Sequence, residues 1–225
     1  MKIYEWNWAP NCRRLRIFLQ EKGLDLPMVE CISPDLSLSG SYRSEYRYAM
    51  VPMLELDDGT QIGEVLSIWH YLETLYPDPP LLGTTALEKA MISAWERRAY
   101  DEGLIGYAEI SRNSHPNFVD RGLPGHRTPV PQIPALIERG KLRVAHFHRM
   151  FDEQLSRNKF VAGDKFSAAD ITAIAVVDFG RALGMEMPSE FSNMRRWYDD
   201  TQRIESVKKS LPNRSPDGVL LETAA

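Results

Sequence analysis

Residues 9–23, APNCRRLRIFLQEKG, decide the fold, because a strand pattern changes to a helix pattern within them. Residues 3–8, IYEWNW, are aromatic and β-branched, which is typical of a strand. From Asn11 onward apolar residues recur at helical spacing, although three arginines interrupt the apolar face. Pro10 separates the two patterns and Gly23 stands where the helix would end. The stretch therefore predicts a strand that leads directly into a helix.

The next fifty residues add three strands and a second long helix. Asp58-Gly59 is a strong hairpin-turn signal, so the runs on either side of it should pair. Residues 33–48 are polar and weakly periodic, which indicates a loop with a short helix. The remaining elements are expected at these positions: strands at 27–32, 51–56 and 60–63, and a helix at 64–76. The predicted order is strand, helix, strand, short helix, two strands, helix.

The second half of the chain has a different character. Residues 76–80, YPDPP, cannot continue a helix and indicate a linker. Helical patterns follow at 85–112, 135–156, 167–183 and 189–209, with a Pro- and Gly-rich loop at 115–134. We therefore predict an α/β domain over residues 1–77 and an all-helical domain over residues 85–211.

Composition excludes several classes of function. Of the 225 residues, 43% are hydrophobic and the formal net charge is only −4, which gives no reason to expect nucleic acid as a partner. Two cysteines make no disulfide framework, so we expect a cytoplasmic protein. The chain has no run of about 20 apolar residues, so no membrane association is expected. The histidines show no metal-ligand spacing, and we predict no metal.

Three motifs of the first domain could bind a ligand. The helix that begins near Asn11 and Cys12 would present free N–H groups and a partial positive charge to an anion. Val51-Pro52 opens a strand, and a cis bond there would expose the Val51 backbone to a peptide-like ligand. Glu64 follows a Gly turn and could hold an ammonium group, while the next backbone N–H groups could hold a carboxylate.

A fourth motif, in residues 160–171, is structural. Ser167 and Asp170 fit a capping-box variant, and Phe166 and Ile171 are placed for a hydrophobic staple. This motif should start the central helix of the second domain.

In this order and spacing, the four motifs resemble the soluble glutathione transferase superfamily from about Lys2 to Tyr198. The resemblance implies a thioredoxin-like N-terminal domain followed by the helical domain. It implies glutathione as the co-substrate, a small hydrophobic electrophile, and a homodimer. It places glutathione across the following residues: Asn11, Val51, Pro52, Glu64 and Val65.

The sequence departs from that family at two positions. Many relatives have Ser, Tyr or Cys where this chain has Ala9, and the usual Glu-Ser pair is Glu64-Val65. Three replacements for the missing hydroxyl stay open: the side-chain amide of Asn11, a mixed disulfide at Cys12, or backbone N–H groups alone. Each of these residues also has a purely structural explanation. Cys12 could pack in the core, Asn11 could cap the helix, and Glu64 could be an acid that only favours the start of a helix.

Three functions follow from these alternatives. The first is an enzyme that transfers glutathione to an electrophile, or uses glutathione in a reduction or isomerisation, with Asn11 and Cys12 as the candidate catalytic residues. The second is a non-catalytic binding or regulatory protein that kept the fold. The third is a thiol reductase that acts through Cys12. Trp6 and Trp8, near the strand end, and Tyr107 and Arg112, late in a long helix, are further candidates for lining a cleft.

Overall fold

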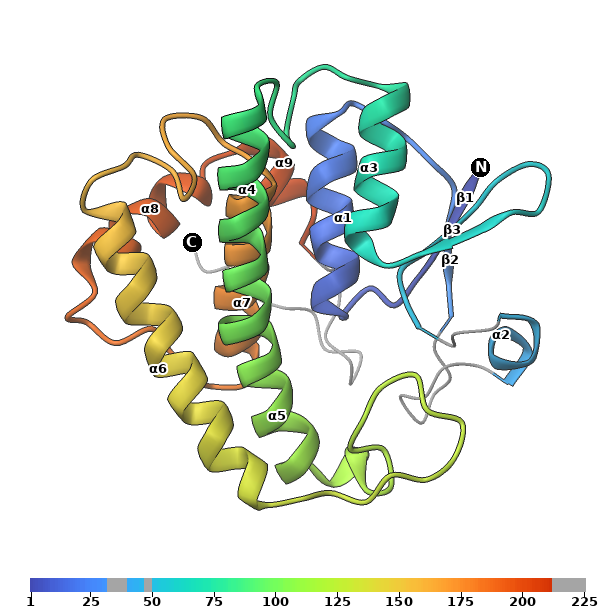
Figure 1. The fold of residues 1–225 in the computed structure, drawn as a ribbon. Helices are drawn as coiled ribbons and strands as arrows, with labels where there is room; N and C mark the ends of the chain where they lie inside the picture. Colours follow the sequence, from blue (N-terminus) through green and yellow to red (C-terminus); the bar gives the residue numbers. More distant parts are fainter. Residues whose placement is uncertain (32–39, 47–49, 212–225) are drawn as a thin grey trace.

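A mixed four-stranded sheet forms the first part of the chain (Figure 1). This computed structural model describes residues 1–31, 40–46 and 50–211. The strand order is β2-β1-β3-β4, in which β1 and β2 are parallel and the other neighbours are antiparallel. The strands are as follows: β1 Lys2–Glu5, β2 Met28–Glu30, β3 Met53–Glu55 and β4 Gln61–Gly63. The predicted order of elements along the chain is confirmed, as is the α/β class of this part.

Two long helices, α1 (Pro10–Glu21) and α3 (Val65–Leu75), lie side by side against the sheet (Figure 1). Phe18 of α1 and Trp69 of α3 stack with their ring centroids 5.4 Å apart. The short helix expected within residues 33–48 is α2, Gly40–Glu45. The rest of that expected loop, residues 33–39 and 47–48, lies outside the described part of the chain.

The first strand is shorter than its sequence suggests. β1 ends at Glu5, because the chain turns at once and the Ala9 N–H donates to the Trp6 carbonyl at 2.8 Å. The Asn7 N–H turns toward Glu30, to which it donates at 3.2 Å. Trp6 and Trp8 therefore lie in a turn, where the alternation of a strand does not apply.

The second part of the chain is helical, as predicted. Its first run is continuous but changes to π-helical geometry at η1, between α4 and α5. The elements are as follows: α4 Ala86–Arg98, η1 Ala99–Leu104, α5 Ile105–Ser114, η2 Pro116–Phe118, α6 Ala135–Leu155, α7 Ala168–Ala182, α8 Ser192–Thr201 and α9 Glu205–Lys209. None of the helices in the described ranges has the length and apolarity needed to cross a bilayer. The domain limits 1–77 and 85–211 stay a prediction.

The arginines that interrupt the apolar face of α1 join this helix to the second part of the chain. Arg13 forms an ion pair with Asp178 of α7 at 2.7 Å. Arg16 pairs with Glu5 and also donates to the Ser210 carbonyl at 3.0 Å, beyond α9. Helix α1 therefore lies between the sheet and α7, and packs against both.

Helix α7 is the buried axis of the helical part, and Asp170 at its start bonds three segments together. The side chain is fully buried. It accepts hydrogen bonds from the Ser167 N–H at 3.0 Å and hydroxyl at 3.1 Å, which confirms the predicted box. It also accepts from the Val161 N–H at 2.8 Å and the Trp197 indole at 2.9 Å. Asp170 thus fixes α7, the loop before it and α8 in one arrangement.

We expect Asp170→Asn to lower the free energy of unfolding by about 3 kcal/mol or more. Burial raises the pKa of Asp170 to about 6, so at pH 7.5 the carboxylate is charged and accepts all four donors. An amide has one acceptor oxygen, and its NH₂ group would face buried donors. Urea unfolding measures the change. Asp164→Asn, at an exposed acid of the preceding loop, should change it by less than about 0.5 kcal/mol, and equal effects would contradict this role.

Candidate functional site

The residues predicted from the three binding motifs gather at one edge of the sheet. Both β1 and β4 are antiparallel to β3, so their carboxyl ends lie at the same edge. Helices α1 and α3 follow these two strands and begin there (Figure 1). Strand β3 starts at that edge, immediately after a cis Val51-Pro52 bond. The register pairs Met53 with Gly63, which brings Pro52 beside Glu64.

Two helix N-termini therefore converge on this edge without side-chain caps. Ala9 occupies the N-cap of α1 and has no side-chain oxygen to offer the first-turn N–H groups. Glu64 occupies the N-cap of α3 and makes no capping bond. Free first-turn N–H groups and the helix dipole make such a position favourable for an anion.

The backbone of Glu64 has a left-handed φ of 62°, which costs a residue with a side chain roughly 1–3 kcal/mol. Its side chain is exposed, whereas that of Val65 is 3% exposed and packed in the core. Glu64 can therefore reach a ligand with its carboxylate, and Val65 can do so only with its backbone N–H.

Asn11 lies inside the first turn of α1, and its side chain does not cap the helix. Its carbonyl oxygen accepts a hydrogen bond from Nη1 of Arg14 at 2.8 Å. The amide nitrogen has no partner among residues 1–31, 40–46 and 50–211. Asn11 is half-buried, so a donor at the edge of the sheet remains available to a ligand.

Arg14 holds this amide from a buried position between the two parts of the chain. Its Nε donates to the Thr172 hydroxyl of α7 at 2.9 Å, and its Nη2 pairs with Glu96 of α4. The guanidinium also lies over the rings of Trp69 and Tyr100, 5.0 and 5.4 Å from their centroids. Sequence reasoning missed Arg14, since its partners are 82 and 158 residues away along the chain.

Comparison with known proteins settles the family. The sequence profile of the glutathione S-transferase N-terminal domain matches residues 3–80, and that of the C-terminal domain matches residues 132–205. Glutathione S-transferase 2 of Saccharomyces cerevisiae is 34% identical over 219 residues, which cover 96% of this chain and 91% of the yeast protein. The chain belongs to the glutathione S-transferase family.

Solved structures of this family agree with that assignment. The crystal structure of Gtt2 from Saccharomyces cerevisiae has a TM-score of 0.83 and 32% identity, over 94% of this chain and 100% of that one. A glutathione S-transferase domain-containing protein from Marinobacter aquaeolei has a TM-score of 0.82 and 28% identity, over 92% and 100%. The thioredoxin-like first part and the helical second part are therefore the glutathione S-transferase fold.

The two cysteines of this glutathione S-transferase family member are free thiols in the core. Cys12 is 0% exposed, and its sulfur accepts a hydrogen bond from the Trp6 N–H at 3.4 Å. Burial raises its pKa far above the ordinary range. Cys31 is also buried, and burial raises its pKa to about 12. The geometry favours packing over reactivity at Cys12, because only the thiolate is a nucleophile.

The other candidate cleft residues divide into two groups. Tyr107 is 1% exposed and packs against Gly180, where a Cβ would lie 2.4 Å from the tyrosine hydroxyl, so it belongs to the core. Arg112 is half-buried over Phe118 and donates to the Arg121 carbonyl at 3.0 Å. Burial and the neighbouring Arg121 lower the pKa of Arg112 to about 10. Trp6 and Trp8 are half-buried beside the start of α1.

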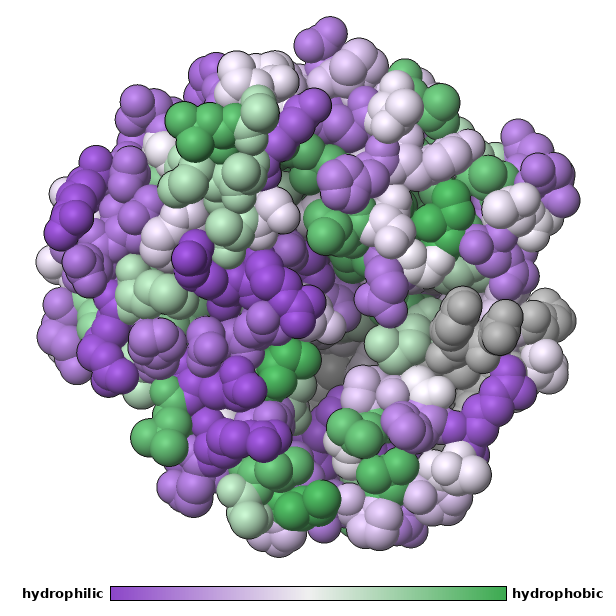
Figure 2. Space-filling view, viewed as in Figure 1, coloured by the Kyte–Doolittle hydropathy of each residue, from purple (hydrophilic) through white to green (hydrophobic). Residues whose placement is uncertain are grey.

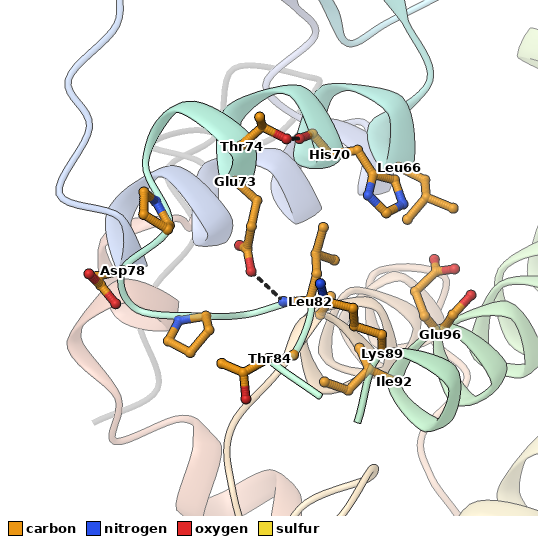
Figure 3. A pocket seen from close by; sticks show the side chains of 15 residues that line it. Leu66, His70, Glu73, Thr74, Asp78, Leu82, Thr84, Lys89, Ile92 and Glu96 are labelled. Carbon is orange, nitrogen blue, oxygen red and sulfur yellow. Dashed lines mark hydrogen bonds between the residues drawn. The ribbon is translucent and has the colours of Figure 1, made fainter. Parts of the chain in front are cut away.

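In this transferase fold, a cavity beside the linker is separate from a surface hollow near the start of α1. A cavity of about 600 Å³ lies between α3, the linker and α4, lined by His70, Glu73 and Glu96 among others (Figure 3). None of the predicted site residues lines it, and Glu73 there accepts from the Leu82 N–H at 2.8 Å. On the face drawn in Figure 2 the surface is hollowed near its centre, close to where α1 begins in Figure 1. Within the described ranges, no three metal-ligating side chains gather to form a metal site.

We expect neither cysteine to react with Ellman's reagent in the folded protein at pH 8. Both thiols are buried, so the reagent cannot reach them. Their pKa values are also raised, so almost none of either thiol is in the reactive thiolate form. Unfolding in urea should release two thiols per chain. Ser93→Cys, on the exposed face of α4, is the positive control and should add one reactive thiol to the native protein. Rapid labelling of native Cys12 would restore the thiol-reductase hypothesis.

Proposed function

We propose that this chain is a glutathione transferase that activates the glutathione thiol at the N-terminus of α1 and transfers it to a small hydrophobic electrophile. One observation carries the proposal: the uncapped first turn of α1, in which the Asn11 amide nitrogen has no partner among the described residues, begins at the edge that holds cis Val51-Pro52 and Glu64. Donors aimed at a sulfur anion favour the thiolate over the thiol, and so lower the thiol pKa.

The γ-glutamyl and cysteinyl parts of glutathione each have a complementary group at this edge. The Val51 backbone can pair with the cysteinyl peptide, as a strand would. The Glu64 carboxylate can pair with the γ-glutamyl ammonium, and the Val65 N–H with its carboxylate. The thiol releases its proton to water, and the Asn11 amide donates a hydrogen bond to the resulting thiolate. The thiolate attacks the electrophilic carbon, a carbon–sulfur bond forms, and the leaving group departs with the bonding electrons.

A non-catalytic binding protein is the second candidate, favoured by Ala9 and Val65, which lack the usual hydroxyls. A protein that kept the fold and lost the site should not be retained on a glutathione column. Turnover with an activated aryl halide separates the two candidates. The Cys12 reductase is disfavoured by the burial of that sulfur.

We also propose that the chain forms a homodimer, because members of this family usually do. Sedimentation equilibrium at micromolar concentration should give twice the 25.7 kDa mass of the chain. A single-chain mass under those conditions would contradict this proposal.

Calorimetry should show saturable glutathione binding at pH 7. Glu64→Gln should weaken it about ten- to hundredfold, because a charged pair with the ammonium is lost. Glu153→Gln, an exposed acid at the far end of α6, is the matched control and should bind as the unchanged protein does. If the unchanged protein shows no heat of binding with several millimolar glutathione, the proposal fails.

Asn11→Ala should raise the pKa of the bound glutathione thiol by about one pH unit, because one charge-assisted hydrogen bond is lost. At pH 6.5, below the raised pKa, turnover with an aryl halide should fall about tenfold, and the loss should shrink as the pH rises. Thiolate absorbance near 240 nm and the pH profile of kcat/KM measure both effects. An unchanged profile would leave the backbone N–H groups of α1 as the activating donors.

A further inference from the structure

We infer that Arg14 is a positioning residue of the glutathione site, because it fixes the Asn11 side-chain amide with its nitrogen toward the ligand. The inference rests on the proposed function. It adds that activation of the thiol depends on a buried cation that is shared with the helical part of the chain.

The orientation follows from hydrogen-bond chemistry. An amide side chain can rotate by half a turn and exchange its oxygen for its nitrogen at nearly equal volume. Arginine has five N–H donors and no acceptor, so only the oxygen of Asn11 can face Nη1 of Arg14. That contact is 2.8 Å long, and it leaves the NH₂ group facing away from Arg14. Without Arg14 the amide could turn its oxygen toward the thiolate, and the partial negative charge of that oxygen would repel the thiolate.

The guanidinium is itself held by several contacts. Thr172 and Glu96 accept from it, and the side chains of Arg14 and Glu96 are only 3% and 5% exposed. The guanidinium carbon also lies over the rings of Trp69 and Tyr100, 5.0 and 5.4 Å from their centroids. Thr172 also donates to Glu96 at 3.2 Å, which closes the network. A planar fork with this many partners has little freedom to rotate, so its Nη1 donor is pre-oriented.

The network also reaches across the molecule. Asn11 and Arg14 lie on α1, whereas Glu96 lies on α4 and Thr172 on α7. The donor geometry at the thiol therefore depends on how α1 packs against the helical part. A change in that packing would alter the thiol pKa without touching glutathione.

The test removes the cation together with its counter-ion, since either alone would leave a buried charge unpaired. Arg14→Met with Glu96→Met should raise the pKa of bound glutathione by about one pH unit, with affinity within about threefold of the unchanged protein. Adding Asn11→Ala to this pair should raise the pKa no further, because Arg14 acts through Asn11. Additive increases would overturn the inference, as would an unchanged pKa in the pair.

The matched control is Arg13→Met with Asp178→Asn, which removes the neighbouring ion pair between α1 and α7 but leaves Asn11 and its partner. It should lower stability without moving the thiol pKa. An equal rise in that control would overturn the inference, because general loosening of α1 would then explain both.

Asn11→Asp keeps the whole cation network and covers the case in which the paired variant does not fold. One carboxylate oxygen retains the contact with Arg14, and the other replaces the amide nitrogen. The thiol pKa should then rise above that of Asn11→Ala, and a lower or equal value would overturn the inference. Absence of glutathione binding in the unchanged protein would remove the proposed function and this inference together. Intact binding with an unmoved pKa in the paired variant removes the inference alone.

Discussion

The buried ion pair between Arg14 and Glu96 is the contact on which the arrangement of this molecule depends. Burying two charges costs several kcal/mol per ion, and close geometry alone rarely offsets that cost. Here Thr172 and Asn11 also accept hydrogen bonds from the guanidinium, Thr172 donates to Glu96, and the cation lies over two aromatic rings. The pair therefore specifies one way of packing α1 against α4 and α7, and the edge where glutathione is proposed to bind takes its shape from that packing.

Much of the fold could be predicted from local patterns, because local forces fix those features. The hairpin at Asp58-Gly59, the break after Tyr76 and the capping box at Ser167 all depend on residues a few positions apart. The order of strands and helices follows from them. The length of β1 could not be predicted, because IYEWNW reads as one strand and the turn after Glu5 is set by contacts with α1 and β2.

The candidate site was predictable as a set of positions but not as a mechanism. Val51, Pro52 and Glu64 could be assigned from motifs, and the register brings the last two together. The roles of the arginines could not be assigned, since in a helical pattern they are only interruptions of an apolar face. That they are paired could have been predicted, because charged residues that interrupt an otherwise apolar helix face must be paired if that face is buried. A single sequence does not reveal which distant carboxylate pairs with each arginine.

The same constraint explains how a transferase site could tolerate Ala9. A hydroxyl at that position would donate one hydrogen bond to the thiolate, a contribution of about 1.5–3 kcal/mol. The Asn11 amide nitrogen, which has no partner in the described part of the chain, lies one helical position beyond Pro10 and is proposed to make the same kind of bond, provided that the amide is oriented. A serine hydroxyl needs no such help, because it is donor and acceptor at one atom. When an amide replaces the hydroxyl, the orientation of the donor therefore depends on the buried cation Arg14 and not on the ligand-facing residue alone.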